Sequence, residues 1–276
     1  MRFGWIGVGV MGRHMASHLM AAGHEARVFS RTASKCQPLV ERGAVLAASP
    51  REAAEDADVV FTMVGAPQDV ETVILGDEGA LTGLSPGSLL VDMTTSTPTL
   101  ALHIAAWAAA QGVLALDAPV SGGDVGAEAA SLSIMCGGSE PAFEAARPWL
   151  ELMGKSISHM GGPGAGQHTK MCNQVPSPEA EPNAQRSRSS RPRVGSSVTP
   201  SQSQLFRRLP SPPITFPPCG QILACSNMIG AAESLVYARR AGLDPEAVVR
   251  CALATTPVPS HPLGRPVPSS LYPSQC

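Results

Sequence analysis

Residues 7–12 read GVGVMG, and the predicted fold is built around this glycine-rich turn. Its glycines have the spacing G-x-G-x-x-G and directly follow a short apolar run, RFGWI, at residues 2–6. Apolar residues then recur at a helical period as far as Gly23, and a second apolar run follows at 25–30. A strand, a glycine turn, a helix and a strand within about 30 residues predict a dinucleotide-binding turn rather than a tight turn without a ligand. In such a turn the glycines let the backbone approach a pyrophosphate, and the helix N-terminus supplies unpaired N–H groups.

The end of the second predicted strand bears on which dinucleotide would bind. An NAD enzyme usually has Asp or Glu there, where the carboxylate accepts hydrogen bonds from the ribose hydroxyls. This chain has Ser30, followed by Arg31 and Thr32. We therefore expect no carboxylate that would repel a 2′-phosphate, and an arginine and two hydroxyls that can bind one. NADP is predicted in preference to NAD, the alternative being that Arg31 is only a solvated loop residue.

Strands and helices continue to alternate after this unit. Ser49 and Glu52 have the spacing of a capping box, with Pro50 at the first helical position. The predicted strands are 58–64, 89–93, 113–117 and 131–136, and the further predicted helices are 67–75, 97–111 and 140–153. This alternation predicts an α/β fold, a Rossmann-type doubly wound parallel sheet with helices on both faces. Ligands of such sheets bind beyond the carboxyl ends of the strands, where Val64, Gly65, Ala66, Thr94 and Thr95 lie. For Gly65 and Ala66, an ordinary loop without a ligand is the alternative.

Two later stretches carry groups that can meet a substrate. Residues 117–123, DAPVSGG, follow a strand, and the two glycines after the Ser121 hydroxyl can expose consecutive N–H groups to a carboxylate. A turn without a ligand is the alternative. Residues 164–174, GAGQHTKMCNQ, begin as a glycine turn and continue as a helix. Lys170 and Asn173 therefore lie three residues apart on one helical face and can converge on one small molecule.

Four motifs in this order, at residues 4–12, 92–96, 117–123 and 164–173, closely resemble the β-hydroxyacid dehydrogenase family. Within it they resemble most the proteins labelled 3-hydroxyisobutyrate dehydrogenase-like, which have an NADP-binding domain of the 6-phosphogluconate dehydrogenase type. The resemblance covers residues 1–174 and resumes at about residue 222. It implies that the glycine turn and Thr95 bind the nicotinamide cofactor and that Lys170 is the catalytic acid/base. It also implies that the substrate carboxylate is held at 121–123 and the substrate oriented by Asn173.

The predicted site residues fall into three groups. The predicted cofactor contacts are Gly7, Val8, Gly9, Val10, Met11, Gly12, Ser30, Arg31, Thr32, Val64 and Thr95. The predicted substrate contacts are Ser121, Gly122, Gly123 and Asn173, the predicted catalytic residue is Lys170, and no metal is expected.

The chemistry of a lysine side chain also suits Lys170 to this role, independently of the family resemblance. Oxidation of a β-hydroxy acid requires removal of the hydroxyl proton as hydride leaves for the nicotinamide, and reduction requires the reverse. A lysine can exchange that proton if burial or nearby positive charge lowers its pKa, and as a cation it stabilises a developing alkoxide. The chain has only three lysines, and an exposed helical lysine is the alternative. His168 is the rival acid/base, but at two residues from Lys170 it should point to a different face.

The composition changes at Val175. Residues 175–221 hold ten prolines, nine serines and six arginines among 47 residues and show no apolar periodicity, which predicts disorder. Joining Gln174 to Ile222 would give one continuous helix like the family's, so we interpret the segment as a translated, retained intron. Its borders permit GT and AG splice signals. The alternative is a real basic tether that uses residues 186–208 to bind RNA or acidic partners.

The predicted domain organisation follows from these boundaries. Residues 1–166 form the NADP-binding Rossmann domain, and 167–174 with 222–256 form the remnant of an all-α C-terminal domain. Residues 175–221 are the disordered insert, and 257–276, with six prolines in 20 residues, are a disordered tail. The family would continue with several more helices, so the incomplete domain argues against the family's dimer.

Composition limits the classes of function. A net charge of −2 argues against a nucleic-acid role for the whole chain. Seven cysteines without a C-x-x-C pair predict reduced thiols, with neither zinc nor disulfides. No apolar run reaches the roughly 20 residues that span a bilayer, and no targeting segment precedes the first strand. The chain is therefore expected to be cytoplasmic, or organellar if its N-terminus is incomplete.

The predicted function is hydride transfer between NADP(H), or less favourably NAD(H), and a small β-hydroxy acid or semialdehyde. Candidate substrates are 3-hydroxyisobutyrate and a semialdehyde such as the succinic or glyoxylic one, with Lys170 as general acid/base. The alternative is a catalytically impaired NADP-binding fragment or splice product.

Overall fold

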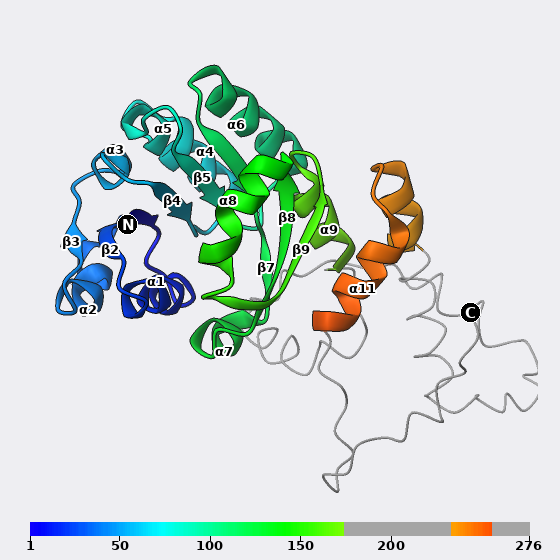
Figure 1. Cartoon of the computed structure of the whole chain (residues 1–276), viewed down its shortest axis with the longest axis horizontal. Coiled ribbons are helices and arrows are strands. Elements are labelled where there is room, and N and C mark those ends of the chain that lie inside the picture. Colours follow the sequence, from blue (N-terminus) through cyan, green and yellow to red (C-terminus); the bar gives the residue numbers. More distant parts are fainter. Residues whose placement is uncertain (174–232, 256–276) are drawn as a thin grey trace, which may run out of the picture. The chain divides into compact units, whose positions relative to one another are not determined.

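A computed structural model describes the chain over residues 1–173 and 233–255 (Figure 1). The predicted insert, the tail and residues 222–232 of the predicted remnant lie outside these described residues. The chain divides into two compact units, one made of Met1–Asn173 with Tyr237–Cys276 and the other of Gln174–Val236. Of the second unit only residues 233–236 are described, and they are helical.

The described part of the first unit is built on one sheet of nine strands (Figure 1). The strands are β1 (Arg2–Ile6), β2 (Glu25–Phe29), β3 (Val45–Leu46), β4 (Val59–Thr62), β5 (Leu89–Asp92), β6 (Leu114–Asp117), β7 (Val120–Ser121), β8 (Leu132–Gly138) and β9 (Gly154–Gly161). The first six run parallel in the order β3-β2-β1-β4-β5-β6. This is the strand order of doubly wound dinucleotide-binding sheets, so the predicted Rossmann-type class is confirmed.

The sheet is not parallel throughout, which corrects the prediction for its last strands. β8 runs antiparallel to both β6 and β7, and β9 then pairs in parallel with β8. A parallel pairing of the consecutive strands β7 and β8 would need a crossover connection of a dozen or more residues, usually a helix. Only a short helix, α7 (Gly123–Glu128), stands between β7 and β8, so the chain returns in the opposite direction.

The helices of the described chain follow the predicted alternation closely. They are α1 (Gly12–Ala21), α2 (Gln37–Val40), α3 (Pro50–Ala54), α4 (Pro67–Leu75), α5 (Ala80–Gly83), α6 (Pro98–Ala110), α7, α8 (Glu140–Leu150), α9 (Ala165–Asn173) and α11 (Pro245–Thr255), with a 3₁₀ turn at Ala33–Cys36. Local caps set several starts: the Ser49, Thr97 and Ser139 side chains each accept a backbone N–H from the first turn of α3, α6 and α8. Gly23, at φ +90°, ends α1 as expected.

Side chains on alternate positions of the central strands fill one hydrophobic layer on each face of the sheet. On one face Trp5 stacks on Phe61, with ring centroids 5.4 Å apart, beneath α1 and α8. On the other face Val60 and Leu90 pack under α3 to α6. Burial on both faces explains why β4 and β5 read as continuous apolar runs.

The described C-terminal residues add to the first unit. The helix α11 contacts α9, β8 and β9. A third apolar cluster holds these elements together, and it includes Met135, Cys172, Val248 and Cys251. The helix α11, Pro245–Thr255, lies within the predicted remnant 222–256. None of the described helices is long and apolar enough to cross a membrane.

Candidate functional site

The three glycines of the 7–12 turn each meet a different steric demand. Gly7 has φ +101°, and a Cβ there would overlap the carbonyl oxygen of Met63. A Cβ on Gly12 would overlap the carbonyl oxygen of Gly7, so α1 packs directly on the turn. A Cβ on Gly9 would meet nothing within 4 Å, because that position faces open space. Gly7 thus allows the tight turn, Gly12 the close packing of α1, and Gly9 the close approach of a ligand, which are the three features that a dinucleotide turn needs.

The N-terminus of α1 is also suited to an anion. Among the described residues no side chain caps it, since Met11 at the N-cap position makes no side-chain cap hydrogen bond. The first N–H groups of an uncapped helix carry partial positive charge and bind phosphate well. The turn and the helix therefore fit the pyrophosphate of a dinucleotide.

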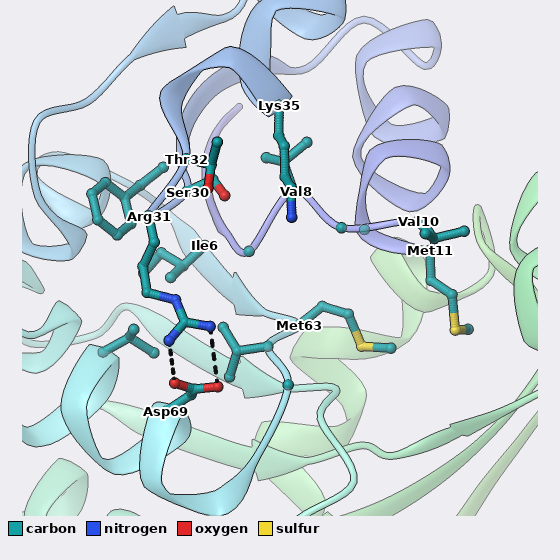
Figure 2. Close-up of a pocket in the computed structure, with 17 residues that line it drawn as sticks. Ile6, Val8, Val10, Met11, Ser30, Arg31, Thr32, Lys35, Met63 and Asp69 are labelled. Carbon is teal, nitrogen blue, oxygen red and sulfur yellow. Dashed lines mark hydrogen bonds and ion pairs between the residues drawn. The ribbon is translucent and has the colours of Figure 1, made fainter. Parts of the chain in front are cut away.

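A pocket of about 370 Å³ opens between this turn, the end of β2 and the start of α4 (Figure 2). Its lining includes every predicted cofactor contact except Thr95: Gly7, Val8, Gly9, Val10, Met11, Gly12, Ser30, Arg31, Thr32 and Val64. Thr95 is exposed and lies outside this pocket. Gly65 lines the pocket, whereas Ala66 does not.

Two charged residues of the lining, Lys35 and Asp69, were not predicted from the sequence. Lys35, in the 3₁₀ turn after β2, extends its side chain into the pocket (Figure 2). It follows Arg31 by four residues along the chain, in the 3₁₀ turn Ala33–Cys36 that comes directly after the β2 end, so both cations lie near the same strand end. Asp69, in the first turn of α4, is the other.

Asp69 corrects the expectation that no carboxylate faces a 2′-phosphate site. Arg31 Nη1 lies 2.7 Å from Asp69 Oδ1, and Arg31 Nη2 lies 3.4 Å from Oδ2 (Figure 2). The carboxylate comes from the start of a different helix, 38 residues further along the chain, so inspection of the β2 end alone could not find it.

The predicted substrate and catalytic residues form a second cluster. Lys170 Nζ donates a 2.7 Å hydrogen bond to Ser121 Oγ, and Ser121 Oγ donates a 2.8 Å hydrogen bond to Asn173 Oδ1. Lys170 and Asn173 thus share a face of α9, as the spacing predicted, and this face meets the end of β7.

Lys170 is almost wholly buried, with 7% of its surface exposed. Burial lowers its pKa below the ordinary lysine value, and the Cys251 thiol on α11 acts in the opposite direction. His168 points elsewhere, since its Nδ1 lies 2.7 Å from the Tyr237 hydroxyl oxygen. Its expected orientation away from Lys170 is therefore confirmed.

The glycines after Ser121 adopt conformations that side chains rarely allow. Gly122 has φ +132° and Gly123 has φ +63°. A Cβ on Gly123 would meet nothing within 4 Å, so this backbone is open to a ligand. The arrangement is compatible with an anion-binding turn beside Lys170.

Two further residues, Asp117 and Gln167, hold α9 in place and were missed as site residues. Asp117 Oδ1 accepts the Gly164 N–H at 2.7 Å, and Oδ2 accepts the Gln167 N–H at 2.9 Å. Burial raises the pKa of Asp117 to about 7, and the neighbouring Asp92 adds to the rise. Through its two hydrogen bonds, the Asp117 side chain connects the start of α9 to the end of β6.

Gln167 connects this helix to the end of β5. Its Nε2 donates to the Thr94 carbonyl oxygen and its Oε1 accepts the Ser96 N–H, each at 2.8 Å. The Thr94 hydroxyl in turn accepts the N–H of Val64, a pocket residue, at 3.1 Å. Hydrogen bonds thus join the 370 Å³ pocket to the helix of Lys170. Within the described residues, no group of three or more His, Cys, Asp or Glu could hold a metal ion.

Comparison with known proteins shows which family model and which proteins this chain is similar to. Residues 2–162 match the model of the NAD binding domain of 6-phosphogluconate dehydrogenase. The probable 3-hydroxyisobutyrate dehydrogenase-like 1, mitochondrial, of Arabidopsis thaliana is 41% identical over 244 residues, covering 88% of this chain and 59% of that protein. The NAD-dependent L-serine dehydrogenase of Pseudomonas aeruginosa is 46% identical over 169 residues, covering 61% and 57%.

A solved structure is also similar. The 3-hydroxyisobutyrate dehydrogenase of Mycobacterium tuberculosis with L-serine superposes with a TM-score of 0.59 at 38% identity, over 63% of this chain and 59% of that one. The chain thus spans less than three fifths of the length of each of these three proteins.

Proposed function

Because the chain belongs to the NAD(P)-dependent β-hydroxyacid dehydrogenase family, with an NAD-binding domain of the 6-phosphogluconate dehydrogenase type, we propose that it transfers hydride between NADP(H) and a small β-hydroxy acid or its semialdehyde. The observation that carries this proposal is the partly buried Lys170–Ser121–Asn173 cluster, with contacts of 2.7 and 2.8 Å. It is joined by hydrogen bonds to the pocket of the glycine turn.

A nicotinamide dinucleotide, when bound, accepts or donates the hydride. Lys170 exchanges the hydroxyl proton: as the neutral amine it takes the proton during oxidation, and as the ammonium it returns it during reduction. The lowered pKa of Lys170 brings the two forms closer in energy. Ser121 and the backbone of Gly122 and Gly123 hold the substrate carboxylate, and the Asn173 amide orients the substrate. The buried setting strengthens the attraction between the ammonium and a developing alkoxide.

The proposed preference for NADP rests on the cations at the end of β2. Arg31 and Lys35 both line the pocket, together with the hydroxyls of Ser30 and Thr32. Two cations and two hydroxyl donors suit a phosphate better than a bare ribose. One relative is named as NAD-dependent, so the preference has to be measured directly.

The substrate class follows from the size of the cluster and the names of the relatives. Lys170 and the 121–123 turn can engage one hydroxyl and one carboxylate, as 3-hydroxyisobutyrate and L-serine each carry. We propose 3-hydroxyisobutyrate or a short semialdehyde as the first compounds to assay.

The test uses the full chain in two steps. NADP⁺ and NAD⁺ are titrated by calorimetry, and then reduction of a panel of short semialdehydes is followed at 340 nm, the absorbance of the reduced nicotinamide. We expect tighter binding of NADP⁺ and measurable turnover of at least one compound. Absence of dinucleotide binding would exclude the dehydrogenase assignment for this chain.

A second candidate is favoured by the composition of residues 175–221. In this alternative the chain is an NADP-binding splice product without turnover. Binding without reduction of any compound would support it. Sequencing of the transcript then decides the origin of the segment: a message lacking the codons of 175–221 indicates a retained intron in this chain, and uniform retention in abundant message contradicts that.

A further inference from the structure

The Arg31–Asp69 ion pair places an anion inside the pocket that is proposed to take a phosphate. We infer that Asp69 is a specificity-determining residue, which limits the preference for NADP by competing with the 2′-phosphate for Arg31. The inference rests on the proposed dinucleotide binding and adds a restraint on its selectivity.

The pair is asymmetric in its freedom to move. The Asp69 side chain is 24% exposed, whereas that of Arg31 is 74% exposed. Asp69 sits in the first turn of α4, where the helix dipole favours a carboxylate. A Cβ on Gly65 would lie 3.2 Å from Asp69 Oδ2, so the backbone passes close beside this carboxylate. Asp69 is therefore the fixed partner and Arg31 the mobile one.

A 2′-phosphate changes the balance of charge around Arg31. A phosphate monoester carries about −1.5 to −2 charges at neutral pH, and it binds arginine through two parallel hydrogen bonds. The guanidinium already presents two N–H groups to Asp69, at 2.7 and 3.4 Å. Arg31 must either leave Asp69 or bring the phosphate close to the carboxylate. Both outcomes reduce the net gain from binding NADP.

Binding of NAD does not require Arg31 to leave Asp69. Its adenosine ribose carries a neutral hydroxyl where NADP carries the phosphate, so Arg31 can remain paired with Asp69. Lys35, also in the pocket, offers a second cation that would partly compensate for the loss when NADP binds. The selectivity then depends on how strongly Asp69 retains Arg31.

Removal of the Asp69 charge tests this inference in the full chain. Asp69→Asn keeps the size of the side chain, and Glu71→Gln removes one negative charge from an exposed position of the same helix. We expect Asp69→Asn to tighten NADP⁺ binding about two- to five-fold, the range of an exposed ion pair, and to change NAD⁺ binding less than about two-fold. Glu71→Gln should leave the ratio of the two affinities unchanged. Retained NAD⁺ binding shows that the variant is folded.

Two further measurements test whether Asp69 affects NADP⁺ binding through its ion pair with Arg31. In an Arg31→Ala background, Asp69→Asn should change NADP⁺ affinity less than about two-fold, since no guanidinium is left to release. The gain in the wild-type background should also shrink at high ionic strength.

Three results would overturn the inference: weaker NADP⁺ binding by Asp69→Asn, an equal change for NAD⁺ and NADP⁺, or an undiminished effect without Arg31. Weaker binding would mean that Asp69 orients Arg31 for the phosphate. If the wild-type chain binds neither dinucleotide, the proposed function fails instead.

Discussion

The dinucleotide pocket and the Lys170 cluster differ in how they are assembled. The pocket takes its lining from residues 6–73, between the end of β1 and the helix α4, and its glycine turn and α1 are continuous in the sequence. The Lys170 cluster joins the end of β7 to α9 across about 50 residues, and α9 itself is held by Asp117 and Gln167. One site is a local motif on an open surface, and the other depends on the position of one short helix. The two sites should therefore fail in different ways when they are altered.

Lys170→Ala should produce the largest difference between the two regions. Loss of a general acid/base lowers turnover by about 10²- to 10⁴-fold, whereas NADP⁺ affinity should stay within about two-fold, because Lys170 does not line the pocket. Steady-state kinetics and calorimetry measure the two effects. Lys155→Ala, at an exposed lysine, is the matched control. An unchanged turnover number would remove Lys170 from the mechanism.

The glycine turn can be broken without touching the Lys170 cluster. Gly12→Ala adds a Cβ that overlaps the Gly7 carbonyl oxygen and lies 2.9 Å from Trp5 Nε1, so it should lower the free energy of unfolding by about 1–3 kcal/mol. Gly9→Ala meets nothing within 4 Å and should change stability by less than about 0.5 kcal/mol, yet weaken NADP⁺ binding. Thermal unfolding and titration separate the two. Equal stability losses would contradict distinct roles for these glycines.

The anchor of α9 should make stability depend on pH. The pKa of Asp117 is raised from 3.8 to about 7, so the folded state binds more protons than the unfolded state between these values. The contribution of this group to stability is therefore fully present below about pH 4 and is lost as the pH rises toward 7, by at most about 1.4 kcal/mol per pH unit. Urea unfolding at several pH values measures this slope. In Asp117→Asn the slope should become flatter, and an identical slope in both proteins would exclude Asp117 as its source.

The smallest expected effect concerns Lys35. Lys35→Ala should weaken NADP⁺ binding about two- to five-fold and leave NAD⁺ binding and stability nearly unchanged, since an exposed cation contributes little beyond its contact with the phosphate. Comparison with Arg31→Ala, measured by the same titration, shows how the two cations share the phosphate. A larger loss for NAD⁺ than for NADP⁺ would place Lys35 elsewhere on the dinucleotide.

Much of the fold was predictable because its signals are local. The capping residues Ser49 and Thr97, the stop at Gly23 and the helix at 67–75 each depend on neighbours within a few residues. The strands β3 and β9 were missed: β3 has only two residues, and β9 alternates only partly buried side chains. β8 includes Gly137 and Gly138, two residues beyond the end of the predicted strand 131–136. The strand continues there because α9 packs directly against Gly137, where a Cβ would lie 2.5 Å from the Gly166 nitrogen.

The candidate site was predictable to a similar extent. The glycine turn followed from spacing, and the shared face of Lys170 and Asn173 followed from helical geometry. The roles assigned to Ser121 and Lys170 came from a family resemblance, and their 2.7 Å contact is consistent with it. Asp69, Asp117 and Gln167 were not identified, because each acts on a partner 38 or more residues away.

The amino-acid sequence alone predicts the Rossmann-type class, the glycine turn and the helical face that bears Lys170. Glycine spacing, caps and apolar periodicity act through hydrogen bonds and steric contacts between residues close in the sequence. They can therefore be recognised from a single sequence. The three-dimensional structure was needed to show that Arg31 pairs with a carboxylate, that β8 reverses direction, and that Gln167 links the Lys170 helix to the pocket. These three features depend on where the ends of strands and the starts of helices meet in space. A local sequence pattern does not identify a partner that is distant in the sequence.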